Sequence, residues 1–354
     1  MKRVEEATQL TDRDRTILKD VIVSYILSAE PVSSRAVAKR GALGLSAASI
    51  RNVMADLEEF GYLTQPHTSA GRVPTSKGYH LYIRSMMDGS ALSTSELRYI
   101  DDNLAAHDQD ADELMAAASQ LLSELTHQIG IVLTPALAET VLKTIDFISL
   151  SESKVLCVVV SNSGFVDNKV IVTPEPIPRE DLVRISNYLT ENFGGLPLRE
   201  VRSRILGMMA EERAQVDRLL AQTISLAQAG LSMPEQPGVL VEGAQEVLQQ
   251  PELSDVVRIR CLFDTFADKA RLVFLLTQCM EGQGVRVVIG DESDVTSPLD
   301  FSLVTSTYGA EGRALGTLGI FGPSRMEYRR IIPLVDYLGE RLSQALSATF
   351  APDA

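Results

Sequence analysis

The sequence is poor in cysteine: only Cys157, Cys261 and Cys279 occur among its 354 residues, and they lie far apart. No CxxC pair and no Cys/His cluster is present, so the sequence predicts neither a disulfide framework nor a metal site. All three cysteines sit in apolar segments, which is typical of buried, reduced thiols in a cytoplasmic protein. We therefore expect no metal ion and no cofactor.

Long apolar runs are also missing. The longest, VLCVVV at 155–160, is far shorter than the roughly 20 residues that a membrane helix needs, and it suits a buried strand instead. The first ten residues, MKRVEEATQL, are too polar for a signal peptide. We expect a cytoplasmic protein that makes no membrane contact. Its length exceeds one ordinary core and predicts two or three domains.

Catalytic motifs are absent as well, since the chain contains no GxSxG, P-loop or HExxH pattern. The segment GIFGPSRMEYRRI resembles a phosphate-binding loop before a helix. However, Gly319 and Gly322 also permit a tight turn from a strand into a helix, and Pro323 and Ser324 suit the start of that helix. The sequence therefore predicts a protein that is not an enzyme.

Carboxylates are missing from one particular segment of an otherwise acidic chain. The net charge is −14, yet residues 1–90 hold 12 Lys and Arg against 10 Asp and Glu, a net of +2. Residues 91–354 hold 21 against 37, a net of −16. The stretch GYLTQPHTSAGRVPTSKGY, residues 61–79, has no carboxylate at all. A basic island on an acidic body indicates a localised contact with a polyanion.

Local signals in the first ninety residues predict three helices followed by a hairpin. The first helix begins with a capping box of Thr11 and Asp14, the second is capped by Ser33 or Ser34, and the third is capped by Ser46. The segments YLT and RVP then read as short strands around the loop QPHTSAG. This order predicts a winged helix-turn-helix, a DNA-binding module.

The outer face of the third helix, near residues 47–60, carries the side chains that suit base reading. At about 100° per residue, Ala48, Arg51 and Asn52 point away from the core. Arg and Asn are shaped for bidentate contacts with guanine and adenine, while hydroxyls at a helix start and a carboxylate-free wing suit phosphate. Taken singly, each side chain is also typical of a solvated surface, so the prediction depends on the ordered set. The expected DNA-binding residues are Ser33, Ser34, Arg35, Ser46, Ala48, Ser49, Arg51, Asn52, His67, Thr68, Ser69, Arg72 and Lys77.

The remaining chain reads as one antiparallel sheet interrupted by a mostly helical block. An amphipathic helix, ELMAAASQLLSELTHQIG, precedes a meander of three strands. Pro-rich sequence and two helical stretches, about 180–192 and 199–229, follow it. The C-terminal part begins after the possible short strand VLVEG. It is expected to contain a helix at about 264–281, the strands VRVVIG, FSLVTSTYG and ALGTLGIFG, and a terminal helix at 326–348.

Two long segments resemble a known family. The first segment is EPVSSRAVAKR together with LSAASIRNVMADLEEFGYLTQPHTSAGRVPTSKGYHLYI, and the second is LGTLGIFGPSRMEYRRIIPLVDYL. Both are similar to the bacterial heat-inducible transcription repressors called HrcA. The similarity covers nearly the whole chain, although His80 stands where Arg is common. It implies an α+β multidomain fold with a winged helix, a GAF-like domain and an inserted dimerisation domain. The expected domains are 1–90 for the winged helix, 91–172 and 256–354 for the GAF-like domain, and 173–255 for the insert.

The resemblance also implies a function. Family members repress chaperone operons, bind an inverted repeat called CIRCE as homodimers, and are kept active by the chaperonin GroEL. We therefore expect a repressor of heat-shock operons whose partners are double-stranded DNA, a GroEL-type chaperonin and a second copy of the chain. The alternative is a small-effector regulator of the IclR type, which also joins a winged helix to a GAF-like domain.

Overall fold

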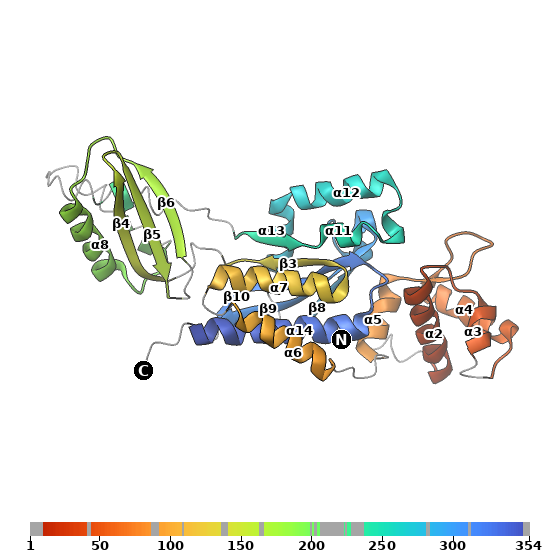
Figure 1. Cartoon of the computed structure of the whole chain (residues 1–354). Helices are drawn as coiled ribbons and strands as arrows, with labels where there is room; N and C mark the ends of the chain where they lie inside the picture. The colour runs from red at the N-terminus through yellow and green to blue at the C-terminus, as the bar shows by residue number, and fades with distance from the viewer. Residues whose placement is uncertain are drawn as a thin grey trace.

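The computed structural model separates into an N-terminal helical unit, a central sheet domain and a smaller unit inserted into the sheet domain (Figure 1). None of the helices that it describes combines the length and apolar character needed to span a bilayer. The described residues are 10–40, 44–85, 92–107, 110–135, 141–162, 166–198, 200–201, 204–205, 223, 225–227, 237–280, 284–310 and 313–349.

The N-terminal unit follows the local sequence signals. The capping box of Thr11 and Asp14 starts the first helix, and Ser46 accepts a hydrogen bond from the Ser49 amide at the start of the third. Ser33 caps the second helix, because its hydroxyl accepts from the Ala36 amide at 3.2 Å. The elements are α2 (Asp12–Ser28), α3 (Ser34–Arg40), α4 (Ala47–Glu59), β1 (Leu63–Thr64), β2 (Val73–Pro74) and α5 (Ser76–Ser85).

The central domain is built on a five-stranded sheet in which every neighbouring pair is antiparallel. Its strands, in spatial order, are β7 (Val239–Glu242), β3 (Ile129–Leu133), β10 (Arg313–Pro323), β9 (Phe301–Ala310) and β8 (Arg286–Ile289). Short 3-10 turns, η3 (Pro251–Leu253), η4 (Gly290–Glu292) and η5 (Ser297–Leu299), lie in the connections. The mixed α+β class with antiparallel sheets is therefore confirmed.

Helices cover both faces of this sheet, and the alternation of side chains along β3 shows why. Ile129, Ile131 and Leu133 pack into an apolar cluster on one face, whereas Val132 joins the cluster on the other. The first cluster includes residues of α11 (Ala244–Val247), α12 (Val256–Ala267) and α13 (Lys269–Cys279); the second includes α6 (Thr94–Ala105), α7 (Ala111–Thr126) and α14 (Tyr328–Thr349) (Figure 1). With both faces covered, β3 is buried along its whole length.

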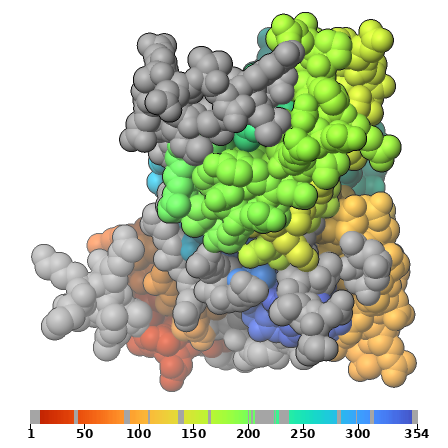
Figure 2. All heavy atoms as spheres, turned by 90° about the vertical axis from the view of Figure 1, so that its left-hand side faces the viewer, coloured from red at the N-terminus to blue at the C-terminus, as the bar shows by residue number. Residues whose placement is uncertain are grey.

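The strand meander forms a separate sheet, which corrects the expectation of a single interrupted sheet. Among the described residues, strands β4 (Leu142–Ser151), β5 (Lys154–Ser161) and β6 (Val166–Val172) pair only with one another, and α8 (Arg179–Phe193) packs on them around a core of their own. Figure 2 looks towards this unit, coloured yellow to green. Strand β7, expected inside the insert at 173–255, instead pairs with β3 of the central sheet. Strand alternation shows which face is buried but does not show which sheet a strand joins.

Two further expectations differ from the structure. The helix expected to continue to Gly130 ends at Thr126, because His127 adopts a left-handed conformation and the chain then enters β3. The single helix expected at 264–281 is two helices, α12 and α13, with Asp268 at their junction, where its side chain caps α13. Most of the helical stretch expected at 199–229 lies outside the described residues.

Candidate nucleic-acid interface

Helix α4 presents the face that the sequence predicted. Its inward side chains, Ile50, Val53, Met54 and Leu57, are buried in the core of the N-terminal unit. Ala48, Arg51 and Asn52 are exposed on the opposite side, and Ala55 is exposed one turn further on. The helix lies on the side of the unit that faces away from the sheet domain (Figure 1). The backbone of α4 is therefore accessible along a face that carries one Arg and one Asn between two small residues.

The residues before and at the start of the helices divide into exposed and buried positions. Ser33, Arg35 and Ser46 are exposed, and Ser49 is partly exposed beside Ser46, with their hydroxyl oxygens 3.0 Å apart. Ser34 is only 8% exposed. The first turn of α3 therefore turns Ser34 inward while its neighbours face solvent, so Ser34 does not belong to the exposed set.

The loop between β1 and β2 is closed by a residue that the sequence reading missed. The side-chain amide of Gln65 donates hydrogen bonds to the carbonyl oxygens of Thr68 at 3.0 Å and Ala70 at 2.9 Å. The Ala70 amide also donates to the His67 carbonyl oxygen at 2.8 Å. These bonds fold the loop tip, and His67, Thr68 and Ser69 are all exposed there. A glutamine in a loop gives no local sequence signal for this role.

A close backbone approach joins the same loop to the segment before α3. Val32 and Arg72 exchange two backbone hydrogen bonds, each 2.9 Å long. Only glycine fits at the preceding position, because a Cβ atom at Gly71 would lie 2.4 Å from the Val32 carbonyl oxygen. The glycine in SAGRVP is the one sequence signal that points to this contact.

Two of the expected phosphate contacts have partners inside the unit. Arg72 is 18% exposed, and its Nε atom lies 2.8 Å from a carboxylate oxygen of Glu58. The Lys77 ammonium donates to the Phe60 carbonyl oxygen at 3.1 Å and lies 4.7 Å from the centre of the Tyr62 ring. Arg72 thus braces the hairpin, and Lys77 the first turn of α5, against the C-terminal end of α4, which a charge count does not reveal.

The N-terminal unit docks on the sheet domain through α5 and the end of α2. Ser76 donates to Asp291 at 2.8 Å, and His80 lies 2.7 Å from a carboxylate oxygen of Glu292. On α2, the Ile26 carbonyl oxygen accepts a bond from Arg325 at 3.4 Å. Ala48, Arg51 and Asn52 remain exposed with the sheet domain in place, so docking does not cover that face of α4.

Known proteins include relatives that match this chain along most of its length. The family model described as "HrcA protein C terminal domain" matches residues 112–332. The heat-inducible transcription repressor HrcA of Geobacter sulfurreducens is 42% identical over 339 residues, covering 96% of this chain and 99% of that protein. The HrcA of Syntrophobacter fumaroxidans is 38% identical over 341 residues, covering 96% and 98% respectively. A crystal structure described only as a hypothetical protein is 25% identical, with a TM-score of 0.66, and covers 96% of this chain and all of that one. The chain therefore belongs to the HrcA family of heat-inducible transcription repressors.

Proposed function

We propose that this chain represses transcription by binding operator DNA through the exposed face of α4 and the β1–β2 hairpin, as a winged helix-turn-helix. The observation that carries the proposal is the exposed pair Arg51 and Asn52, with Ala48 and Ala55 beside them, on a helix whose other face is fully packed. Small flanking residues let the helix backbone enter a major groove. The Arg and Asn side chains then reach base edges, with Arg suited to guanine and Asn to adenine.

The surrounding residues take positioning roles on the DNA backbone. Hydroxyls and amides at the start of α4 suit a phosphate, because the N-terminal end of a helix attracts anions. The hairpin tip reaches flanking phosphates, and no carboxylate between residues 60 and 87 opposes it. Arg72, which holds the hairpin to α4, and Lys77, at the start of α5, add positive charge behind the tip. The proposed phosphate-contacting set is Ser33, Arg35, Ser46, Ser49, His67, Thr68, Ser69, Arg72 and Lys77.

A second copy of the chain completes the proposed DNA-binding unit. A two-fold homodimer demands an inverted-repeat operator whose half-site centres are separated by one helical turn or a multiple of it. Support for a dimer comes from the outer face of the sheet β4–β5–β6, where Ile148, Leu156 and Val170 lie side by side in register. Ile148 and Val170 are each 51% exposed, and Leu150 and Val172 beside them are also exposed. A contiguous apolar face of this kind is typical of an interaction surface.

We further propose a domain division that follows the sheet topology. The N-terminal DNA-binding domain spans residues 10–85. The GAF-like domain is the five-stranded sheet with its helices. The dimerisation domain is the segment between β3 and β7, so it includes the meander at 142–172 as well as α8. In this division the chain leaves the central sheet at one strand and returns at the neighbouring strand, as an inserted domain requires.

The regulation that fits the family is control of heat-shock chaperone operons through a CIRCE-type operator, with a GroEL-type chaperonin maintaining the active dimer in the cytoplasm. The operator is occupied at growth temperature, and heating lowers the active fraction of repressor. A tenfold loss of the binding-competent population weakens apparent affinity tenfold, about 1.4 kcal/mol. That change is enough to switch transcription from an operator that is held near half occupancy.

Footprinting of the purified protein on its own upstream regions, with and without the chaperonin and across temperature, tests the proposal. We expect one protected inverted repeat, protected less on heating and more when the chaperonin is added. Absence of any sequence-specific protection contradicts the operator proposal. Protection that changes with a metabolite at constant temperature, and not with heat, supports the IclR-type mode of regulation instead.

A further inference from the structure

Arg13, in the first turn of α2, lies beside the first turn of α4. Its Nη2 atom donates a long hydrogen bond of 3.5 Å to the Ser49 carbonyl oxygen, across 36 residues of sequence. Arg13 is exposed, and it has no carboxylate partner among the residues that the structure describes. Because a guanidinium group has five N–H donors, most of those on Arg13 are available to a further acceptor.

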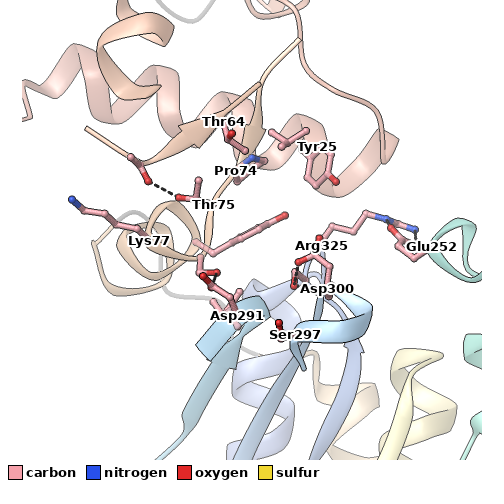
Figure 3. A pocket seen from close by; sticks show the side chains of 16 residues that line it. Tyr25, Thr64, Pro74, Thr75, Lys77, Glu252, Asp291, Ser297, Asp300 and Arg325 are labelled. Carbon is pink, nitrogen blue, oxygen red and sulfur yellow. Dashed lines mark hydrogen bonds and ion pairs between the residues drawn. The ribbon is translucent and has the colours of Figure 1, made fainter. Parts of the chain in front are cut away.

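The end of α2 that carries Arg13 points away from the sheet domain. The other end of the helix makes the docking contact, where the Ile26 carbonyl oxygen accepts from Arg325. Tyr25, beside it, lines the cavity between the two units, with Arg325 and Asp300 on the other side of that cavity (Figure 3). At about 1.5 Å per residue, Arg13 lies about 18 Å along the helix from Tyr25. A change at Arg13 therefore leaves the docking contact intact.

The charges near Arg13 leave its cation unneutralised. Helix α4 has no carboxylate in its first turn, and the first one along it is Asp56. The Asp14 carboxylate is held in the capping box, where the amide and hydroxyl of Thr11 donate to it at 3.0 and 2.8 Å. The Asp12 side chain projects about 100° away from that of Arg13 around α2. The neighbouring carboxylates on the two helices are thus bound elsewhere or directed elsewhere.

The width of a helix determines what such a cation meets when α4 enters a major groove. The groove is about 12 Å wide, and a helix with its side chains is about 10–12 Å wide, so α4 fills the groove. A side chain that reaches the first turn of α4 from a neighbouring helix then lies at the groove wall, where the phosphates are. Ser46 and Ser49, two of the proposed phosphate contacts, lie at this same end of α4 with their hydroxyl oxygens 3.0 Å apart.

We propose that Arg13 is a positioning residue that binds a backbone phosphate at the groove wall and fixes the N-terminal end of α4 on the operator. This inference rests on the proposed function of α4. Lys77 lies at the other end of the helix, at the Phe60 carbonyl oxygen, so the two cations contact different phosphates. A phosphate contact carries no sequence information, so Arg13 affects affinity and salt dependence but not base preference.

The salt dependence of operator binding by full-length Arg13→Gln tests the proposal, on the duplex that footprinting protects. Loss of one phosphate contact makes the plot of log affinity against log salt shallower by about 0.9 per subunit. For a dimer, the affinity of the parent protein then falls about twelvefold further than that of the variant between about 50 and 200 mM salt. Base preference is expected to be retained, and Arg13→Lys, which keeps the charge, is expected to keep a slope close to that of the parent.

A matched control and a second measurement separate a phosphate contact from a structural role. Arg98→Gln removes an exposed arginine from α6 of the sheet domain and is expected to leave the slope unchanged. Duplexes in which single phosphates are replaced by neutral methylphosphonates then locate the contact. We expect one position in each half-site at which the parent protein loses affinity and Arg13→Gln loses none.

The proposal is overturned if Arg13→Gln keeps the slope of the parent, if Arg98→Gln flattens it equally, or if no such methylphosphonate position exists. A variant that melts at a lower temperature and binds more weakly, with an unchanged slope, shows that Arg13 only ties α2 to α4. A parent protein that protects no DNA overturns the operator proposal together with this one. A parent that binds, with an Arg13→Gln variant of unchanged slope, overturns this one alone.

Discussion

Replacing Gly71 by Ala is expected to loosen the hairpin from the rest of the N-terminal unit. The added Cβ atom would lie 2.4 Å from the Val32 carbonyl oxygen, closer than real Cβ atoms approach backbone oxygen. The two segments must therefore separate, and the pair of 2.9 Å hydrogen bonds between Val32 and Arg72 is lost. At about 0.5–1.5 kcal/mol for each bond, the local cost is about 1–3 kcal/mol.

Hydrogen–deuterium exchange at the Val32 and Arg72 amides measures this cost directly, because both amides donate in the bonded pair. Exchange is expected to accelerate about tenfold for each 1.4 kcal/mol that is lost. Ser69→Ala is the matched control in the same loop, since its side chain is exposed, and it should change local stability by less than about 0.5 kcal/mol. If both variants protect the two amides equally well, the close approach at Gly71 does not hold the hairpin and the reasoning is refuted.

Three further substitutions test the proposed DNA-binding unit and its assembly. Arg51→Ala is expected to cost about 1–3 kcal/mol in operator affinity and to relax preference at one position of each half-site, whereas Arg84→Ala, on α5, keeps that preference. Binding assays on operator variants check this, and uniform weakening on all sequences contradicts base reading by Arg51. Lys77→Ala is expected to flatten the salt dependence of binding by about one phosphate per subunit with preference retained; an unchanged slope leaves Lys77 with the bracing role alone. Ile148→Asp is expected to produce monomers in analytical ultracentrifugation, because a charge replaces an apolar side chain on the proposed contact face, while Val183→Asp, at 50% exposure on α8, leaves the dimer intact. Equal behaviour of these two variants removes the β4–β5–β6 face from the dimer contact.

The N-terminal helices were predictable because their signals are local. A capping box at Thr11, a serine cap at Ser46 and an apolar stripe at helical spacing are each complete within a few residues. The exposed positions of Arg51 and Asn52 follow from the same periodicity. The burial of Ser34 escaped it, because a helix of seven residues is too short to show a repeating pattern from which to judge the direction of its first residue.

The arrangement of the strands was not predictable in the same way, because pairing is non-local. Strand β3 pairs with β7 across more than a hundred residues, and nothing in either segment specifies that partner. The meander of β4, β5 and β6 satisfies the same pattern whether it joins the central sheet or forms its own. Charge has the same limit: the sequence shows that Arg72 and Lys77 are basic, but only the fold brings Glu58 and the Phe60 carbonyl oxygen beside them.

Helix α5 connects the proposed DNA-binding unit to the sheet domain. Lys77 on this helix ties its first turn to the C-terminal end of α4, while Tyr79, two residues later, packs its ring against Tyr328 of the sheet domain. Ser76 and His80 on the same helix make the docking contacts with Asp291 and Glu292. A ten-residue helix moves largely as one piece, so a change at these docking contacts also shifts the Lys77 contact with the end of α4. Because the exposed face of α4 is left uncovered by docking, such a change can alter operator affinity only by moving the hairpin or reorienting the whole unit, and not by blocking the side chains proposed to contact DNA.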